Sequence, residues 1–321
     1  MKVIFTGTSE FAVPALEAVI ASAHEVLAVV TQPDRPKGRG GHVQVSPVKE
    51  IALAHSIPIL QPEKISDPEP IGEIRKLGPI GAMIVVAYGQ KIPTELLEWP
   101  RYGVVNVHGS ILPKYRGAAP IQHAIIAGEK TTGVTTMLMD EGWDTGDILL
   151  QESVDIAAGE NAGELSDRLA LLGARLLTRT LDGLETGAIN PIPQDDELAT
   201  LAHSLKRDAG AIDWSAPADA IVNLIRGCTP KPGAFTGHNG ALIKIWRTAV
   251  DRADGLQGAP GEVIRVDHEG FVIAAGSGSV RLVEVQPESR KRASAAEFAH
   301  GSRLKPGDRF EARFEMAASQ V

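Results

Sequence analysis

An asparagine and a histidine lie two residues apart in a short, mostly apolar run, and both could take part in catalysis. In a strand, Asn106 and His108 point to one side, while Val105 and Val107 point to the other. Both polar side chains can donate hydrogen bonds to an oxygen that gains negative charge during a reaction. An Asn–His pair satisfied within the core is the alternative interpretation, and spacing alone does not separate the two.

A second polar group lies in residues 139–148, which read MDEGWDTGDI. The segment contains four acids, Asp140, Glu141, Asp144 and Asp147, with Gly142 and Gly146 permitting a tight turn. A carboxylate from this loop could orient His108 or relay a proton. A solvated acidic loop remains the alternative, and the absence of EF-hand spacing argues against calcium.

A third feature is the basic connection 32–47, QPDRPKGRGGHVQVSP, which carries Arg35, Lys37 and Arg39. Connections of this length exceed the usual few residues and are commonly functional or disordered. Its charges suit phosphates, whereas a passive flexible loop would also fit the composition.

The first half of the chain has the pattern of a doubly wound α/β domain that could position these residues. Short apolar runs at 3–5, 26–30, 83–87 and 104–107 alternate with helical patterns, including 11–20. Such runs predict a parallel sheet covered on both faces, and ligands bind beyond the carboxyl ends of its strands. Neither GxGxxG nor a GxxxxGK[ST] phosphate loop occurs, so a nicotinamide or nucleoside triphosphate site is poorly supported.

The second half changes character after an amphipathic helix expected at 164–185 and a linker-like segment at 188–198. Short alternating runs between glycine-rich turns predict a small β-barrel, with strands at 241–246, 262–266, 270–274 and 279–285. Arg290, Lys291 and Arg292 are consecutive, and an extended segment would present Arg290 and Arg292 together. An ordinary solvated turn is the alternative.

Composition limits the classes of protein that remain. The 321 residues suggest two domains, and the 43% hydrophobic fraction is enough for a sizeable core. Residues 1–204 hold 16 basic against 26 acidic residues, or −10, whereas residues 205–321 hold 16 against 14, or +2. The second half therefore suits a polyanion better than the first. With no signal-peptide core or long apolar run, we expect a soluble cytoplasmic protein that does not bind membranes. We also expect a monomer.

The single cysteine, Cys228, permits no intrachain disulfide and no CxxC metal or redox site. We expect it to behave as a small buried hydrophobic residue.

The segment 106–125, NVHGSILPKYRGAAPIQHAI, resembles the signature of the folate-dependent formyltransferases, and 140–147 is similar to a second motif of that family. Other segments resemble the members that formylate methionyl initiator tRNA. They are TQPDRPKGRG at 31–40, SPVK at 46–49, IDWS at 212–215, IRGCTP at 225–230 and VQPESRKRASAAEF at 285–298. The resemblance therefore extends over most of the chain.

This resemblance implies a formyl donor, 10-formyltetrahydrofolate, an acceptor, methionyl initiator tRNA, and no metal. It implies a Rossmann-like catalytic domain at 1–187, a linker at 188–204 and an OB-like, tRNA-binding barrel at 205–321. The implied catalytic residues are Asn106, His108 and Asp144. The implied folate-contacting residues are Ser110, Ile111, Leu112, Pro113, Tyr88 and Gly89. The implied tRNA-contacting residues are Arg35, Lys37, Arg39, Arg290, Lys291 and Arg292.

The chain departs from the family pattern at three positions: Ser9, Trp143 and Lys231. Ser9 replaces a proline, Trp143 a smaller apolar residue and Lys231 an aromatic residue. None of them is one of the three implied catalytic residues. The alternatives are another folate-dependent formyltransferase, a formyltetrahydrofolate hydrolase and a non-catalytic RNA-binding protein. Only the last of these would leave Asn106, His108 and Asp144 without a role.

Overall fold

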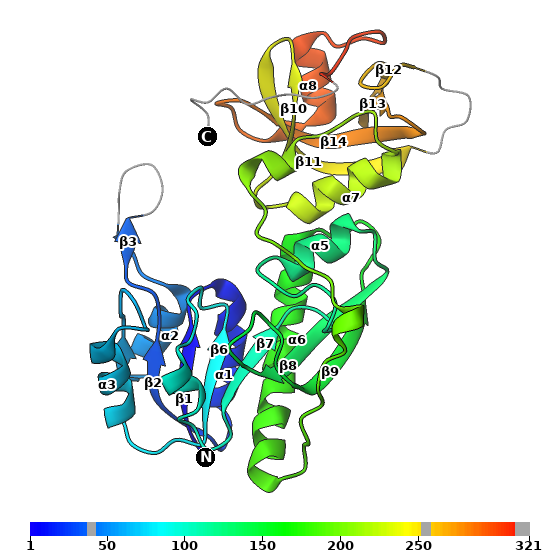
Figure 1. The fold of residues 1–321 in the computed structure, drawn as a ribbon. Helices are drawn as coiled ribbons and strands as arrows, with labels where there is room; N and C mark the ends of the chain where they lie inside the picture. The colour runs from blue at the N-terminus through cyan, green and yellow to red at the C-terminus, as the bar shows by residue number, and fades with distance from the viewer. Residues whose placement is uncertain (37–42, 252–257, 312–321) are drawn as a thin grey trace. The chain divides into compact units, whose positions relative to one another are not determined.

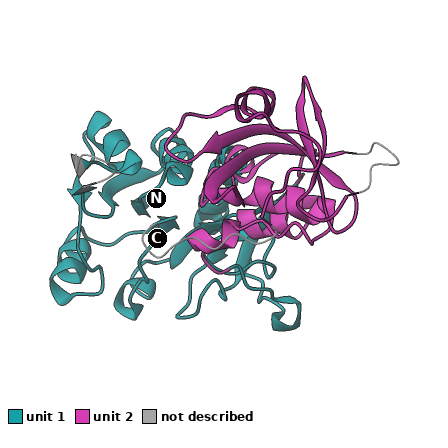
Figure 2. Cartoon of the chain, turned by 90° about the horizontal axis from the view of Figure 1, so that it is seen from above, with its two compact units in different colours: residues 1–120, 132–154, 166–202 teal, residues 121–131, 155–165, 203–321 magenta. Residues whose placement is uncertain are grey.

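The computed structural model describes residues 1–36, 43–251 and 258–311 and shows a chain of two compact units (Figures 1 and 2). The first unit comprises residues 1–120, 132–154 and 166–202. The second comprises residues 121–131, 155–165 and the chain from 203 onward. The second unit thus includes two short pieces from the first half of the chain.

The first unit is built on a seven-stranded sheet with the order β5-β2-β1-β6-β7-β8-β9. The strands are β1 (Lys2–Gly7), β2 (Glu25–Val30), β5 (Ile59–Leu60), β6 (Ala82–Val86), β7 (Val104–His108), β8 (Thr131–Leu138) and β9 (Ile148–Asp155). The first five strands in this order pair in parallel, which confirms the prediction for the four apolar runs. The sheet is not wholly parallel, because β8 pairs antiparallel with β7.

The helices of the first half are α1 (Val13–Ile20), α2 (Pro47–Ala54), α3 (Pro68–Lys76), α4 (Thr94–Leu97), α5 (Pro120–Ile126) and α6 (Ala162–Thr186). Helix α2 begins where the Ser46 hydroxyl accepts from the Lys49 amide and Pro47 occupies the first turn. The predicted helix at 164–185 corresponds to α6, which buries one row of leucines. These are Leu165, Leu169, Leu172, Leu176 and Leu177.

The second unit contains a separate antiparallel sheet with the order β10-β11-β14-β13-β12, and β15 pairs with β14. Its strands are β10 (Ala234–His238), β11 (Ala241–Asp251), β12 (Val263–Asp267), β13 (Gly270–Ala274), β14 (Ser279–Pro287) and β15 (Ala293–Ser294), with helices α7 (Ala218–Cys228) and α8 (Ala295–Ser302). The four predicted strands are confirmed. Among the described residues no pairing joins β10 to β12, so the sheet is an open one.

The core of the second unit gathers around Trp214 and Phe271, both fully buried. The Trp214 indole donates to the Thr236 hydroxyl at 2.9 Å, so its polar atom is satisfied within the core. In the described ranges, none of the helices combines the length and apolar character needed to cross a membrane.

Cys228 ends α7 with no exposed surface, and burial raises the pKa of its thiol to about 11. Because the thiolate is the reactive form, we expect the native protein to resist a disulfide reagent at pH 8. Unfolding in guanidinium should release one reactive thiol. Rapid labelling of the native protein in a spectrophotometric thiol assay would contradict this burial.

Candidate active site

Strand β7 carries Asn106 and His108 to the carboxyl end of the parallel sheet, where they are 8% and 5% exposed. The His108 Nε2 lies 2.9 Å from the Tyr115 carbonyl oxygen, and a carbonyl only accepts, so Nε2 carries the proton. His108 Nδ1 then faces Asp144 Oδ2 at 3.6 Å. The Asn106 amide donates to Asp144 Oδ1 at 3.5 Å, so the structure brings the three predicted residues together.

Asp144 is the one acid of the 139–148 loop with a hydrogen bond or ion pair to this strand among the described contacts. It has a φ of +55°, and its Oδ2 accepts from the Gly117 amide at 2.8 Å. Asp140 instead closes the loop by accepting from the Thr145 hydroxyl at 2.7 Å, and Glu141 accepts from Thr94. The solvated-loop interpretation therefore fits the exposed tip but not Asp144.

The exposed tip of this loop includes Trp143, whose side chain is 71% exposed. The family departure at this position therefore places a large apolar surface in solvent beside Asp144, rather than in a core.

The segment after β7 forms a tight loop that is held mainly by buried hydrogen bonds. The Ser110 hydroxyl donates to the Lys114 carbonyl at 2.6 Å, and the Thr135 hydroxyl donates to the Ser110 carbonyl at 2.7 Å. Ser110 and Leu112 are buried, whereas Ile111 and Pro113 are half-buried. Of the four predicted folate contacts in this segment, the side chains of Ile111 and Pro113 are thus the accessible ones.

Tyr88 and Gly89 follow β6 at the same end of the sheet. Tyr88 is 2% exposed, and its hydroxyl has no hydrogen-bond partner within the described parts of the chain. Burial raises the pKa of this hydroxyl to about 12. The Tyr88 carbonyl accepts from Thr8 and Gln32, and Gly89 adopts a φ of +88°, which favours glycine. A ligand here would meet backbone rather than the phenol ring.

The predicted tRNA-contacting residues lie in two places. Arg35 is exposed in β3 (Arg35–Pro36), which pairs with β4 (Val43–Gln44), and its guanidinium lies 3.2 Å from Glu63. Lys37 and Arg39 fall outside the described residues.

Arg290, Lys291 and Arg292 are exposed in the connection between β14 and β15, outside both strands. The Arg292 guanidinium stacks 3.6 Å from the centre of the Trp246 ring. This cation–π contact orients Arg292.

The segment predicted as a linker makes hydrogen bonds to the site within the first unit. Ile192 pairs with Ile148 of β9, and the Thr200 hydroxyl accepts from the Tyr115 amide at 2.8 Å. Sequence reasoning missed these contacts because the segment has no strand or helix periodicity.

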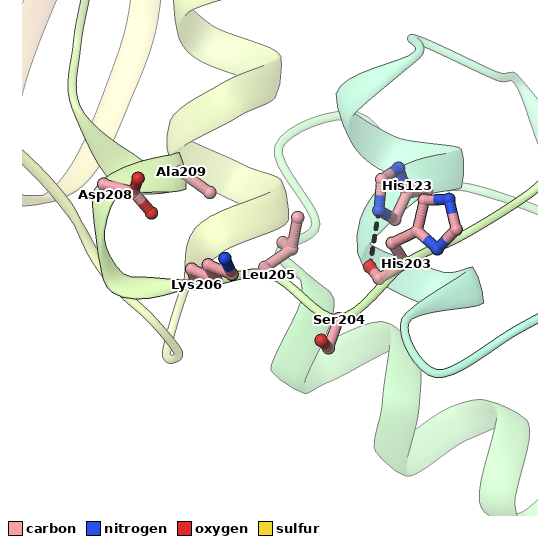
Figure 3. Close-up of a pocket in the computed structure, with 7 residues that line it drawn as sticks. All are labelled: His123, His203, Ser204, Leu205, Lys206, Asp208 and Ala209. Carbon is pink, nitrogen blue, oxygen red and sulfur yellow. Dashed lines mark hydrogen bonds between the residues drawn. The ribbon is translucent and has the colours of Figure 1, made fainter.

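Two cavities lie elsewhere. One of ≈ 330 Å³ in the second unit is lined by His123, His203, Ser204, Leu205, Lys206, Asp208 and Ala209, and His123 Nε2 donates to the His203 carbonyl at 2.9 Å (Figure 3). Another, of ≈ 340 Å³, is lined by residues between 60 and 74. Neither is lined by Asn106, His108 or Asp144, so neither contains the candidate catalytic group.

Comparison with known proteins places this geometry in a family. A family model for formyl transferase matches residues 1–181, and one for the formyl transferase C-terminal domain matches residues 204–303. The methionyl-tRNA formyltransferase of Solibacter usitatus is 51% identical over 304 residues, which cover 95% of this chain and 96% of that protein. The chain belongs to the methionyl-tRNA formyltransferase family. The family member of Geobacter metallireducens is 48% identical and is matched over 98% of its length.

The fold is shared more widely than this family. The chain superposes on an N-formyltransferase from Helicobacter canadensis, solved with folinic acid and dTDP-3-aminofucose, with a TM-score of 0.67. The match covers 89% of this chain and 99% of that chain, at 19% identity. At this identity the likeness establishes the fold and nothing finer.

Gly117 allows the Asp144 contact in this family member, because its φ is +122° and an added Cβ would lie 2.7 Å from the Ala202 carbonyl. We expect Gly117→Ala to lower the free energy of unfolding by about 1–3 kcal/mol and to reduce turnover. Gly72→Ala in α3, where nothing lies within 4 Å, should instead stabilise the protein by up to about 1 kcal/mol. Denaturant titration measures the free energy of unfolding of both variants. Equal values for Gly117→Ala and Gly72→Ala would contradict this account.

Proposed function

We propose that this protein transfers the formyl group of 10-formyltetrahydrofolate to the α-amine of methionyl initiator tRNA at Asn106, His108 and Asp144. One observation carries the proposal for these residues. Two buried polar side chains on β7 converge with Asp144 at 3.5 and 3.6 Å, at the end of the sheet where α/β domains bind ligands.

The reaction moves one formyl group and one proton between two nitrogens. The neutral amine attacks the formyl carbon, and an α-amino group has a pKa of about 8 as a peptide terminus. The new carbon–nitrogen bond forms as an anionic oxygen develops, and the bond to the folate nitrogen then breaks. The acceptor amine releases a proton, and the folate nitrogen gains one, so charge and atoms balance.

Asn106 donates a hydrogen bond to the anionic oxygen in this scheme. One hydrogen of its amide faces Asp144, and the second remains to be donated to the substrate oxygen. Removing such a donor typically costs about 10²–10³ in rate.

His108 acts through Nδ1 in this scheme, because its Nε2 hydrogen is donated to the Tyr115 carbonyl. Nδ1 exchanges the proton that passes from the amine to the folate nitrogen, and Asp144 stabilises the imidazolium formed on the way. The scheme contains no metal ion and no covalent enzyme intermediate.

We further propose that the donor lies against Ser110, Ile111, Leu112 and Pro113, with its pteridine near Tyr88 and Gly89. The proposed domains are a catalytic domain at 1–187, a linker at 188–204 and an OB-like barrel at 205–321. The antiparallel sheet and the C-terminal family model at 204–303 support a separate second domain, and its closure into a barrel is the proposed part, because the described strands form an open sheet. Because charged initiator tRNA is the acceptor, we place the enzyme in the cytoplasm.

The proposed tRNA contacts are Arg35, Lys37 and Arg39 in the first half and Arg290, Lys291 and Arg292 in the second. The exposure of Arg35 and of residues 290–292 supports contact with phosphates, since a buried guanidinium could not reach them.

Replacing both Arg290 and Lys291 by alanine should flatten the salt dependence of tRNA binding by up to about two units of slope. Arg292 is kept because it packs on Trp246. The matched control replaces Lys305 and Arg309, two exposed cations of the same unit, and should change the slope less. Filter binding at several salt concentrations measures the slope of tRNA affinity against salt for each variant. Equal slopes for the two variants would mean that Arg290 and Lys291 do not contact the phosphates of the tRNA.

An acceptor panel tests the proposed function. The protein is given 10-formyltetrahydrofolate with methionyl initiator tRNA, an amino-sugar nucleotide or water alone. We expect formylated methionyl-tRNA as the product. Preferred formylation of the amino sugar would indicate a related transferase. Release of formate would indicate a hydrolase. Binding of tRNA without any product would indicate a non-catalytic RNA-binding protein.

A further inference from the structure

Gln194, from the segment 188–198, holds the backbone of the loop that carries Asp144. Its Nε2 donates to the carbonyl oxygens of Asp144 at 2.9 Å and Gly146 at 2.7 Å. Its Oε1 accepts from Nε and Nη2 of Arg116 at 3.0 and 2.9 Å. Because carbonyls only accept and a guanidinium only donates, these four contacts assign the orientation of the amide.

Arg116 is itself fixed on the chain that contains Gln194. It is 7% exposed, its amide donates to the Thr200 carbonyl at 2.8 Å, and its carbonyl accepts from Ala202 at 2.7 Å. The guanidinium also contacts Asp196 at 2.7 Å, but that carboxylate is 82% exposed and adds little. Two donors on one planar group hold Gln194 in a single orientation.

The two neighbours of Arg116 contact the catalytic pair directly. The Tyr115 carbonyl accepts from His108 Nε2 at 2.9 Å, and the Gly117 amide donates to Asp144 Oδ2 at 2.8 Å. The tripeptide 115–117 therefore touches His108 with one end and Asp144 with the other. Its middle residue binds the glutamine that holds the Asp144 backbone.

We propose that Arg116 and Gln194 are positioning residues that set the Asp144 carboxylate against His108, an inference that rests on the proposed function. Gln194 then gives the segment 188–202 a role in the site beyond that of a connection between domains. Gln194 acts on the reaction through Asp144, because it holds the carbonyl of Asp144 and that of Gly146 two residues later in the same loop. A displacement of about 1 Å at a catalytic group can cost about 10²-fold in rate.

Gln194→Glu distinguishes the role of the amide oxygen, which accepts from Arg116, from that of the amide nitrogen, which donates to the loop. The carboxylate still offers oxygens to Arg116, but it replaces the donor by an oxygen that faces the carbonyls of Asp144 and Gly146. We expect kcat to fall about 10–10²-fold, with KM for both substrates within about twofold of wild type. Asp196→Asn, which alters only the exposed partner of Arg116, should keep kcat within about twofold.

A double-mutant cycle distinguishes a positioning role from a merely structural one, because it compares the kcat of the double variant with that of Asp144→Asn. If Gln194 acts through Asp144, the variant with both Gln194→Glu and Asp144→Asn is as slow as Asp144→Asn alone. Multiplied losses in the double variant, or a wild-type kcat for Gln194→Glu, would overturn the proposal. Where Gln194→Glu lowers thermal stability, Gln194→Met, which is uncharged and similar in size, enters the same cycle. A wild-type protein that forms no formylmethionyl-tRNA would contradict the proposed function instead, so the two failures are distinct.

Discussion

Replacing His108 by alanine is expected to lower kcat by about 10²–10⁴, while the Kd for methionyl initiator tRNA stays within about twofold. The ring is 5% exposed and is oriented by the Tyr115 carbonyl, so its loss removes a positioned proton carrier and leaves the exposed cations unchanged. Single-turnover formylation at saturating donor measures the rate, and filter binding measures the affinity.

His268, which is exposed in the turn between β12 and β13, provides the control for removal of an imidazole. His268→Ala should keep the wild-type rate and affinity. Equal losses of turnover and of tRNA binding in His108→Ala would reassign His108 to the structure of the domain.

Asp144→Asn is expected to lower kcat by about 10²–10⁴ with little change in thermal stability. Asparagine tolerates the φ of +55° at this position, and its side-chain oxygen can still accept from the Gly117 amide. The substitution therefore removes the charge that faces His108 and keeps the Gly117 contact, while the Asn106 amide loses its acceptor. Single-turnover rates and thermal melts of the same preparations measure the two effects.

Asp144→Ala provides the comparison. It loses the Gly117 contact as well as the charge, and alanine does not favour a positive φ, so we expect it to be less stable than Asp144→Asn. A wild-type rate in Asp144→Asn would mean that this carboxylate closes the loop and takes no part in the reaction.

The sequence was most informative where side chains alternate between the two faces of a strand. Asn106 and His108 were predicted to share one side of a strand, and both contact Asp144 in the structure. The helix at 164–185 was equally visible, because its leucines recur at helical spacing and all of them are buried.

Other strands could not be predicted, because their polar residues are satisfied only by tertiary contacts. Strand β8 buries Thr135 and Thr136, whose hydroxyls bond to Ser110 and Thr180, partners distant in the chain. Strand β9 begins with three apolar residues, but its second half, QESVD, is mostly polar and charged and resembles a loop in composition.

The residues that orient the site were the hardest to predict. Gly117 and Gln194 contact Asp144 from 27 and 50 residues away in the sequence, and no periodicity marks either of them. The contact of Arg292 with Trp246, 46 residues earlier in the chain, likewise has no local pattern that marks it. Such contacts depend on the folded chain rather than on local pattern.

Transfer of a labelled formyl group tests the central claim most directly. The protein is mixed with donor carrying a radioactive formyl carbon and with methionyl initiator tRNA, or with the same tRNA whose α-amine has been acetylated. The account predicts one label per free amine on the tRNA and none on the acetylated tRNA. Label on the blocked tRNA, or label released only as formate, would contradict it.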